Sequence, residues 1–208
     1  MDKFMLDIKI SKKGMAVITF LFLVIFIALF PGKSESSEQF IKYVMDNNYF
    51  TCEIPAIWQF ERDKETDAEY KIYEIQLIGP SADNASSEIY VSYYAQDNED
   101  FTDYNIFLVR NSKNILGETK SKRENYGPVN KVVLNGRKTF ELERERMVYL
   151  HPQSKSDESI HIKEKLYVLP AKEGFYVLHY SAPKLLYDEQ LSVFERVVQT
   201  FNPSEKNK

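Results

Sequence analysis

Cysteine, tryptophan and histidine are scarce in this sequence, whose 208 residues include Cys52, Trp58 and three histidines. Since there is one cysteine, no disulfide can form within the chain. The histidines belong to no H-E-x-x-H motif, and neither G-x-S-x-G nor a glycine-rich phosphate-binding loop occurs. These sequence signatures of zinc proteases, α/β-hydrolases and nucleotide-binding enzymes are therefore missing. We predict a non-catalytic protein with no catalytic residues and no cofactor.

Glycine is also scarce, with 7 residues against 14 tyrosines and 14 phenylalanines. Aromatic residues favour β-strands, whereas tight turns favour glycine. This balance predicts a sheet-rich fold with few glycine turns. With 43% hydrophobic and 28% charged residues, the chain can build one ordinary core, which indicates about one domain.

The first 30 residues have the layout of an export signal or a signal anchor. A basic segment, 1–14, precedes an uncharged apolar run, 15–30, which is followed by Pro31 and polar residues. A helix over this run covers roughly 24 Å, short of the ~30 Å hydrocarbon core, so length does not decide between retention and cleavage. We predict a membrane tether through residues 15–30, with the remainder facing outside the cytoplasm. A secreted or periplasmic domain, left after signal cleavage, is the alternative.

The charge balance bears on the class of partner. The chain has a net charge of -4, and its first 30 residues hold four lysines and two aspartates, so the remainder is more acidic still. An acidic protein does not favour nucleic acid or anionic lipid as a partner.

The stretch FTCEIPAIWQF, residues 50–60, contains both the cysteine and the tryptophan. Phe50, Cys52 and Ile54 alternate with polar residues, which predicts a strand with the cysteine on its inward face. A reactive cysteine needs a basic neighbour and exposure, so Cys52 is interpreted as a small hydrophobic residue. Pro55 should end the strand, and Trp58 should fold back onto the core.

Hydrophobic periodicity and turn residues predict the other elements. The first half contains a helix over about 38–46, and strands over about 69–78 and 88–96 with a loop between them. An amphipathic helix follows, capped by Asp100 or Thr102, and its apolar face consists of Phe101, Tyr104, Leu108 and Ile115.

The second half contains a tight turn at Asn135-Gly136 and strands over about 138–150, 160–169 and 175–182. It ends with a helix over about 184–201, whose apolar face consists of Tyr187, Leu191, Phe194, Val198 and Phe201.

The charge run ELERER, 141–146, lies in the predicted strand 138–150. If Leu150 pairs with Ile160, Arg146 lies opposite Glu164 and Glu145 opposite Lys165, so opposite charges face each other across strands. We therefore interpret this run as a solvated sheet surface and not as a ligand clamp. His179, on the next predicted strand, is expected roughly opposite Lys165, a poor neighbour for a cation.

A loop near the end of this strand contains the only candidates for a metal site. The candidate ligands are His151, Asp157, Glu158 and His161. Imidazole and carboxylate groups at such spacing could bring nitrogen and oxygen ligands together. The simpler interpretation is that the histidines lie at the exposed ends of strands.

Three motifs together resemble the PsbP-like superfamily. They are F-x-C-x-I-P-x-x-W at 50–58, V-x-N-G-R at 133–137 and FERVVQTF at 194–201. Broader relatives of this superfamily include DcrB-like envelope proteins and Ran-binding import factors. The sequence departs from the pattern at Ala56 and Ile57, where a glycine is common, and at Thr200, where a serine is frequent. Over about 49–202, the resemblance implies an α+β fold, a central antiparallel sheet sandwiched by helices, in a non-catalytic accessory or binding subunit.

The predicted organisation is thus a basic segment 1–14, a transmembrane or signal helix 15–30, a linker and short helix 31–48, a PsbP-like domain 49–202 and a polar tail 203–208. The favoured hypothesis is a membrane-tethered domain that binds a protein partner in or at the membrane through an exposed apolar or aromatic patch. The alternative is a small-ligand or metal-binding envelope module with an enclosed pocket.

Overall fold

The computed structural model describes residues 39–151, 153 and 156–204. The predicted basic segment and apolar run lie outside this part, as does most of the polar tail. No helix within the described residues is both long and apolar enough to cross a membrane.

The chain from residue 39 onward forms one compact unit with two antiparallel sheets. The elements, in chain order, are β1 (Phe40–Val44), the 3₁₀ helix η1 (Asp46–Asn48), β2 (Phe50–Pro55), β3 (Gln59–Glu61), α2 (Lys64–Tyr70), β4 (Ile72–Ala82), β5 (Ala85–Ala95), α3 (Tyr104–Asn111), β6 (Glu124–Tyr126), β7 (Asn130–Leu134), β8 (Arg137–Tyr149), β9 (Ser159–Ala171), β10 (Gly174–Pro183), α4 (Lys184–Thr200) and β11 (Asn202–Pro203).

The larger sheet has the strand order β3-β4-β5-β10-β9-β8-β6, and β7 pairs with β8 as its eighth strand. Two-residue turns join β4 to β5, β7 to β8 and β9 to β10. The turn at Asn135-Gly136 has φ values of 50° and 78°, which confirms the predicted tight turn. The predicted loop over 79–87 is wrong, because β4 and β5 continue to a turn at Asp83-Asn84. Both of these residues also have positive φ, and Asn and Asp tolerate that conformation better than other non-glycine residues.

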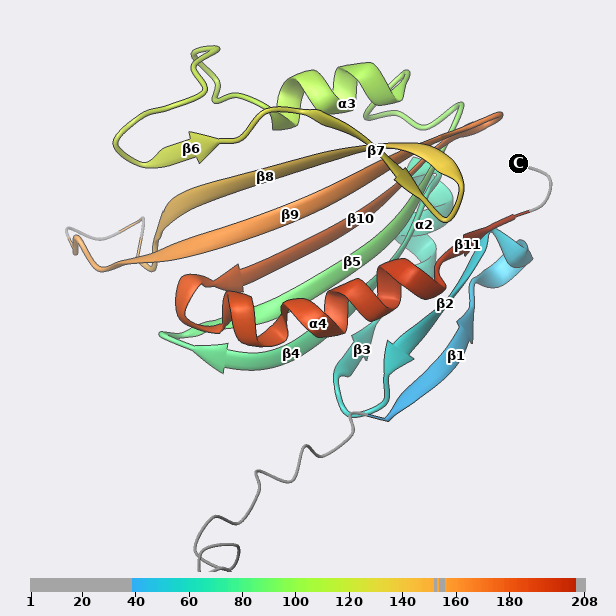
Figure 1. Cartoon of the computed structure of the whole chain (residues 1–208), viewed down its shortest axis with the longest axis horizontal. Helices are drawn as coiled ribbons and strands as arrows, with labels where there is room; N and C mark the ends of the chain where they lie inside the picture. Colours follow the sequence, from blue (N-terminus) through green and yellow to red (C-terminus); the bar gives the residue numbers. More distant parts are fainter. Residues whose placement is uncertain (1–38, 152, 154–155, 205–208) are drawn as a thin grey trace, which may run out of the picture. The chain divides into compact units, whose positions relative to one another are not determined.

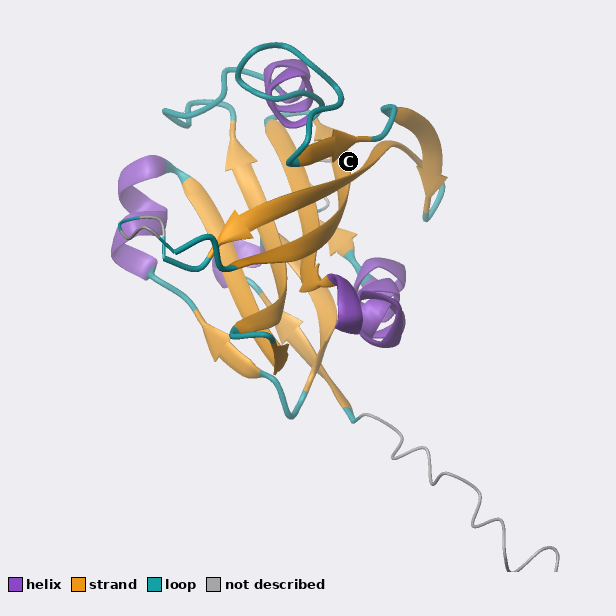
Figure 2. Ribbon diagram, turned by 90° about the vertical axis from the view of Figure 1, so that its left-hand side faces the viewer, coloured by secondary structure: helices purple, strands orange, loops and turns teal. Residues whose placement is uncertain are grey.

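Helices cover both faces of the larger sheet, as the predicted α+β sandwich requires (Figure 1). Along β10, Tyr176 and Leu178 belong to the core beneath α4, whereas Phe175 and Val177 belong to the core beneath α3. This alternation follows from the two-residue period of a strand. Figure 2 shows the helices lying outside the strands. The predicted C-terminal helix is confirmed, since α4 spans Lys184–Thr200.

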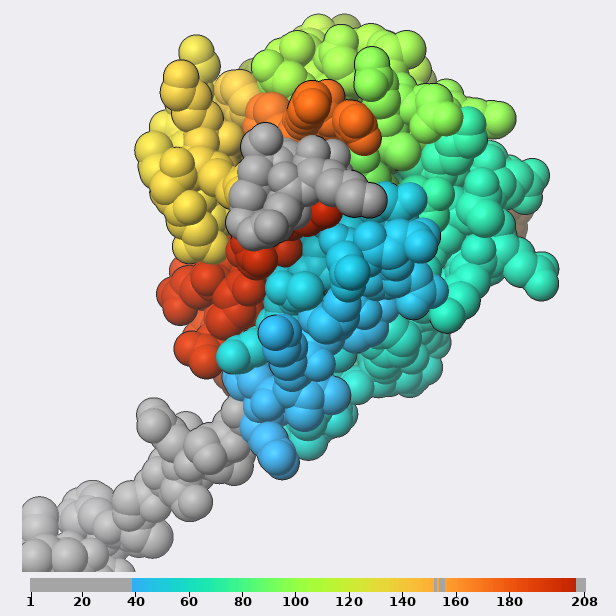
Figure 3. Space-filling model, turned by 90° about the vertical axis from the view of Figure 1, so that its right-hand side faces the viewer, coloured from blue at the N-terminus to red at the C-terminus, as the bar shows by residue number. Residues whose placement is uncertain are grey.

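The smaller sheet, β1-β2-β11, joins the two ends of the compact unit. In Figure 3, β1 and β2 in blue lie beside the C-terminal segment in red. The helix predicted over 38–46 is wrong, because residues 40–44 form β1 and pair with β2. Phe40, Ile41 and Val44 do have helical spacing, but Ile41 and Val44 are β-branched and the neighbouring strand supplies backbone partners.

Helix α3 is shorter than predicted. Its cap is Asp103, whose side chain accepts hydrogen bonds from the backbone of Asn105 and Ile106, and not Asp100 or Thr102. The side chain of Asn98 holds residues 98–101 in a turn, which delays the start of the helix. Ile115 lies beyond the end of α3 and is fully exposed, so it is not part of the apolar face.

Cys52 and Trp58 both pack into the core, as predicted. Cys52 lies between Phe50 and Ile54 on the inward face of β2, and burial raises the pKa of its thiol to about 12. Trp58 packs against Gly79, where an added Cβ would meet the indole ring at 2.5 Å. Cys52 and Trp58 therefore contribute to the core, and neither offers a reactive group.

We expect thiol reagents to label Cys52 slowly in the folded protein and rapidly after denaturation. Its side chain is 2% exposed, and the raised pKa leaves little thiolate at neutral pH. Labelling kinetics with and without urea, followed by mass spectrometry, measure this difference. Rapid labelling of the native protein would contradict the packing role.

Candidate functional site

The face of the larger sheet beneath α3 changes from apolar to polar from one strand to the next. In the aligned row Leu142-Leu166-His179-Tyr90-Gln76, the first two residues are apolar and the last three are polar. Phe107 and Leu108 of α3 cover the apolar part. The side chains of the polar part form a hydrogen-bonded network next to the helix.

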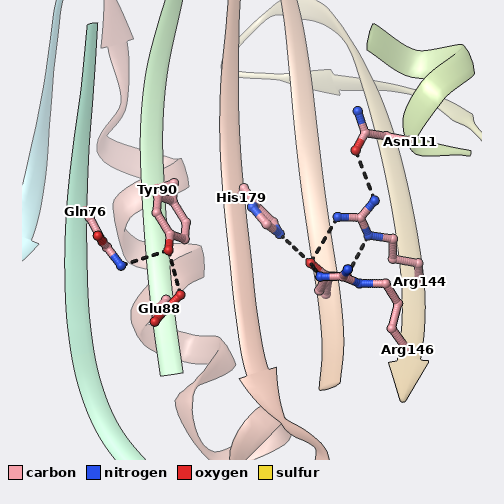
Figure 4. A network of polar contacts seen from close by, with 8 residues as sticks. Gln76, Glu88, Tyr90, Asn111, Arg144, Arg146 and His179 are labelled. Atoms are coloured by element: carbon pink, nitrogen blue, oxygen red, sulfur yellow. Dashed lines mark hydrogen bonds and ion pairs between the residues drawn. The ribbon is translucent and has the colours of Figure 1, made fainter. Parts of the chain in front are cut away.

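Glu164 is the centre of this network, and Figure 4 labels its partners Arg144, Arg146 and His179. Its Oε2 accepts hydrogen bonds from Arg144 Nε at 2.6 Å and Arg146 Nε at 2.7 Å. The Nη2 atoms of both arginines lie 3.1 Å from its Oε1. His179 Nε2 lies 3.0 Å from the same oxygen, and Asn111 of α3 accepts a hydrogen bond from Arg144. One carboxylate thus binds two guanidinium groups and an imidazole.

The sequence prediction found these charges but not their arrangement. In the structure Val148 pairs with Ile160 and Arg144 with Glu164, so the predicted pairing of Leu150 with Ile160 is shifted by two residues. Arg146 still reaches Glu164 diagonally. The prediction of a solvated surface is wrong for Glu164, which is 0% exposed. His179 lies opposite Leu166 and contacts Glu164, so its predicted position near Lys165 is also wrong.

Burial and ion pairing shift the pKa of Glu164 in opposite directions. Burial raises the pKa of a carboxyl group, but the hydrogen bonds and charges of His179 and Arg144 outweigh it and hold the pKa of Glu164 well below its usual range. Glu74, on β4, shows the reverse balance. Burial raises its pKa, although Ser92 donates a hydrogen bond to it at 2.5 Å. The face therefore holds one firmly ionised carboxylate and one carboxylate that burial makes easier to protonate.

A second chain of hydrogen bonds lies on the β4–β5 side of His179 (Figure 4). Gln76 Nε2 donates to Tyr90 Oη at 2.8 Å, and Tyr90 Oη donates to Glu88 at 2.6 Å. The Tyr90 ring stacks on the His179 ring with centroids 5.6 Å apart. The two parts of the network are thus in contact, and together they fix the side chains across five strands.

Two hollows lie along this face. The first, of about 360 Å³, is lined by the Arg144, Arg146, Glu164 and His179 cluster together with Glu88 and Tyr90. The second, of about 770 Å³, lies beside α2 and has an acidic wall. Its acidic residues are Glu61, Asp63, Asp67, Glu74 and Asp100. Both hollows include Glu74 and Tyr94 in their walls, so they adjoin, and we call them together the polar groove.

Helix α2, which the sequence analysis missed, forms one wall of the polar groove. Asp63 caps this helix by accepting hydrogen bonds from the backbone of Glu65 and Thr66. Asp67 is its one buried residue; it accepts hydrogen bonds from the Glu74 backbone at 3.0 Å and from Arg62 at 2.8 Å. Because a carboxylate and not an apolar stripe anchors α2, hydrophobic periodicity gives no signal for it.

The predicted metal candidates lie away from the polar groove. His151 and Glu158 are exposed, with 3.5 Å between His151 Nε2 and Glu158 Oε2. Asp157 is exposed in the same loop, and His161 is exposed on β9 opposite Met147. Across the ranges 39–151 and 156–204, no three His, Cys, Asp or Glu side chains come together in a way that could hold a metal ion.

The network holds charged groups in fixed positions. Glu164 already faces two guanidinium groups, which offset its charge before His179 is counted. The cluster therefore fixes a polar surface whose outer groups can form ion pairs and hydrogen bonds with a bound molecule.

Neither the family models nor the curated proteins include a match to this chain. Similar solved structures include the PsbP protein of the cyanobacterium Synechocystis, with 12% identity, a TM-score of 0.47 and coverage of 82% of this chain and 96% of that one. A Pseudomonas aeruginosa protein of unknown function, PA94, has 14% identity, a TM-score of 0.45 and coverage of 80% and 98%. The Ran-binding protein Mog1p of Saccharomyces cerevisiae has 10% identity, a TM-score of 0.45 and coverage of 80% and 96%.

A PsbP protein and a Ran-binding protein are thus among the structures that this chain resembles, as the sequence resemblance predicted. At these identities and TM-scores the likeness concerns the fold alone. The function proposed below rests on this chain's own residues.

Proposed function

We propose that residues 39–204 form a non-catalytic binding domain whose partner is another protein, which the domain contacts through the polar groove. The observation that carries this proposal is the groove itself, which is open to solvent and lined mainly by polar and charged side chains. Its acidic wall beside α2 suits a partner segment that presents lysine or arginine side chains. In this proposal residues 15–30 tether the domain to a membrane, on the side facing away from the cytoplasm.

The alternative, a small-ligand or metal-binding module, has less support. Ligand sites for small apolar molecules are concave and mostly apolar, whereas the polar groove is open and charged. Many aromatic rings that could line such a site instead stack on one another in the core. Tyr93, for example, packs with Tyr49, Tyr73 and Tyr176.

Crosslinking in native membranes tests this proposal, with the full-length protein as bait. A groove variant, Glu61→Gln with Asp100→Asn, removes two exposed charges of the acidic wall, and we expect it to recover roughly fivefold less partner. The control variant, Asp188→Asn with Glu189→Gln, removes two exposed charges from α4 on the opposite side of the sheet. Equal recovery by both variants would reject the groove as the contact site. A small molecule retained in native mass spectrometry would favour the alternative.

A further inference from the structure

The loop between α3 and β6, residues 112–123, presents apolar side chains to solvent in an ordered conformation. Ile115 is 100% exposed and Leu116 is 78% exposed. Val109, on the adjoining helix, is 53% exposed. Ile115 and Leu116 are consecutive in the chain, so two strongly exposed aliphatic side chains stand together at this loop.

Hydrogen bonds hold this loop in shape. The Asn114 side chain accepts from the backbone of Leu116 at 3.0 Å and of Glu118 at 2.9 Å. The backbone of Asn114 also bonds Glu118 and Gly117, and Gly117 has a φ of 81°. At the base of the loop, the Tyr126 backbone donates to the Thr119 carbonyl at 2.8 Å. The tip is therefore preorganised, and binding would require little further ordering.

The charge of the loop is opposite to that of the whole protein. Residues 112–123 include four basic residues, Lys113, Lys120, Lys122 and Arg123, and one acidic residue, Glu118, whereas the chain carries a net charge of -4. All four basic residues are exposed. No ion pair with a residue of the described part neutralises the three lysines, and Arg123 lies over the Tyr149 ring. Exposed basic residues thus flank the apolar tip on both sides along the loop, and we call them the basic rim.

We propose that the tip formed by Ile115 and Leu116, together with the basic rim, docks onto an anionic lipid bilayer. The aliphatic side chains would enter the boundary between headgroups and acyl chains, and the lysines would lie among the phosphate and carboxylate groups of the lipids. The net charge alone argued against anionic lipid. The electric field of a membrane falls off within a Debye length. The charge of the loop that contacts the membrane, and not the net charge of the chain, therefore determines whether anionic lipid attracts the protein. This proposal is independent of the polar groove.

The test uses the full-length protein with an environment-sensitive fluorophore on Thr119→Cys, beside the tip. Cys52 stays unlabelled because it is buried. The protein is mixed with phosphatidylcholine vesicles, or with vesicles in which about a third of the lipid is phosphatidylserine, and brominated acyl chains report lipid contact by quenching. The control label is Ser192→Cys, an exposed site on α4. We expect quenching at position 119 in the anionic vesicles and none at position 192.

Two variants separate the parts of the surface. The first variant carries Lys120→Glu and Lys122→Glu, and the second carries Ile115→Ser and Leu116→Ser. We expect each of them to lower the ratio of quenched to unquenched label by roughly tenfold. Equal quenching at positions 119 and 192, or in neutral and anionic vesicles, would overturn the proposal. Label burial that occurs only in native membranes and not in lipid vesicles would also overturn it, and would assign the loop to a protein partner.

Discussion

We expect the substitution Glu164→Gln to lower the free energy of unfolding by about 3 kcal/mol. Glu164 is fully buried and binds Arg144 and Arg146 at once, and the arginine side chains are 13% and 37% exposed. Glutamine keeps the shape but loses the negative charge and turns a donor toward one of the guanidinium groups. It leaves two partly buried positive charges without their counter-ion. Urea denaturation, followed through the fluorescence of Trp58, measures the change.

Glu143→Gln is the matched control on the same pair of strands. Glu143 is half exposed and lies 3.6 Å from Lys165, so its loss should cost about 0.5 kcal/mol or less. If the two variants are equally stable, the buried cluster contributes no more to the free energy of unfolding than a surface ion pair does.

The pH dependence of the same pair of proteins gives a second measurement. Because the folded-state pKa of Glu164 is lowered from the ordinary value of 4.5, its stabilising contribution is present above about pH 4.5. It is lost progressively as the pH falls further toward the folded-state pKa. His179 also faces the carboxylate, and the two arginines, Arg144 and Arg146, keep their positive charge in acid. The stability difference between wild type and Glu164→Gln should therefore narrow below about pH 4.5, and a constant difference would contradict the assigned pKa direction.

Gly174→Ala should be the second strongly destabilising substitution, costing roughly 2–5 kcal/mol. Gly174 has a φ of 123°, a conformation that residues with a side chain rarely adopt. An added Cβ would also collide with the carbonyl oxygen of Tyr94, which pairs with the neighbouring Phe175 in the β5–β10 ladder. A backbone atom held in a sheet cannot move away cheaply.

Gly136→Ala separates the two causes. Gly136 has a φ of 78°, but an added Cβ would meet no atom within 4 Å. Its substitution should cost only the left-handed backbone conformation, about 1 kcal/mol. Thermal and urea unfolding of both variants measure the difference, and an equal loss at the two sites would show that the collision with Tyr94 is relieved.

The sequence predicted the second half of the chain better than the first. Strands β8, β9 and β10 are long, alternate regularly and are joined by recognisable turns, and α4 has a broad apolar face. Each of these signals is local. β1 was missed because its helical spacing is overridden by pairing with β2, a tertiary effect. α2 was missed because a buried Asp67 holds it, and burial of a carboxylate cannot be read from periodicity.

The candidate site shows the same limit. The charges of ELERER and their partners on β9 were identified, since opposite charges recur at matching intervals. The register was wrong by two residues because the length of the intervening loop did not fix it. That Glu164 is buried depends on β8 and β10 on either side and on α3 beside them, which are separate in sequence. Their convergence is visible only once the sheet order is known.

The pairing of β2 with both β1 and β11 has a consequence for folding during synthesis. Thr51 pairs with Asn202, and the Phe50 ring packs on Phe201, so β2 stays unpaired on one edge until residue 203 has left the ribosome. The hairpins β4–β5, β8–β9 and β9–β10 can form earlier, because their partners are neighbours in the chain. Closure of the small sheet is therefore a late step for the nascent chain. Until then the open edge of β2 is available for pairing with other chains, and a chaperone that covers that edge would protect the unfinished domain.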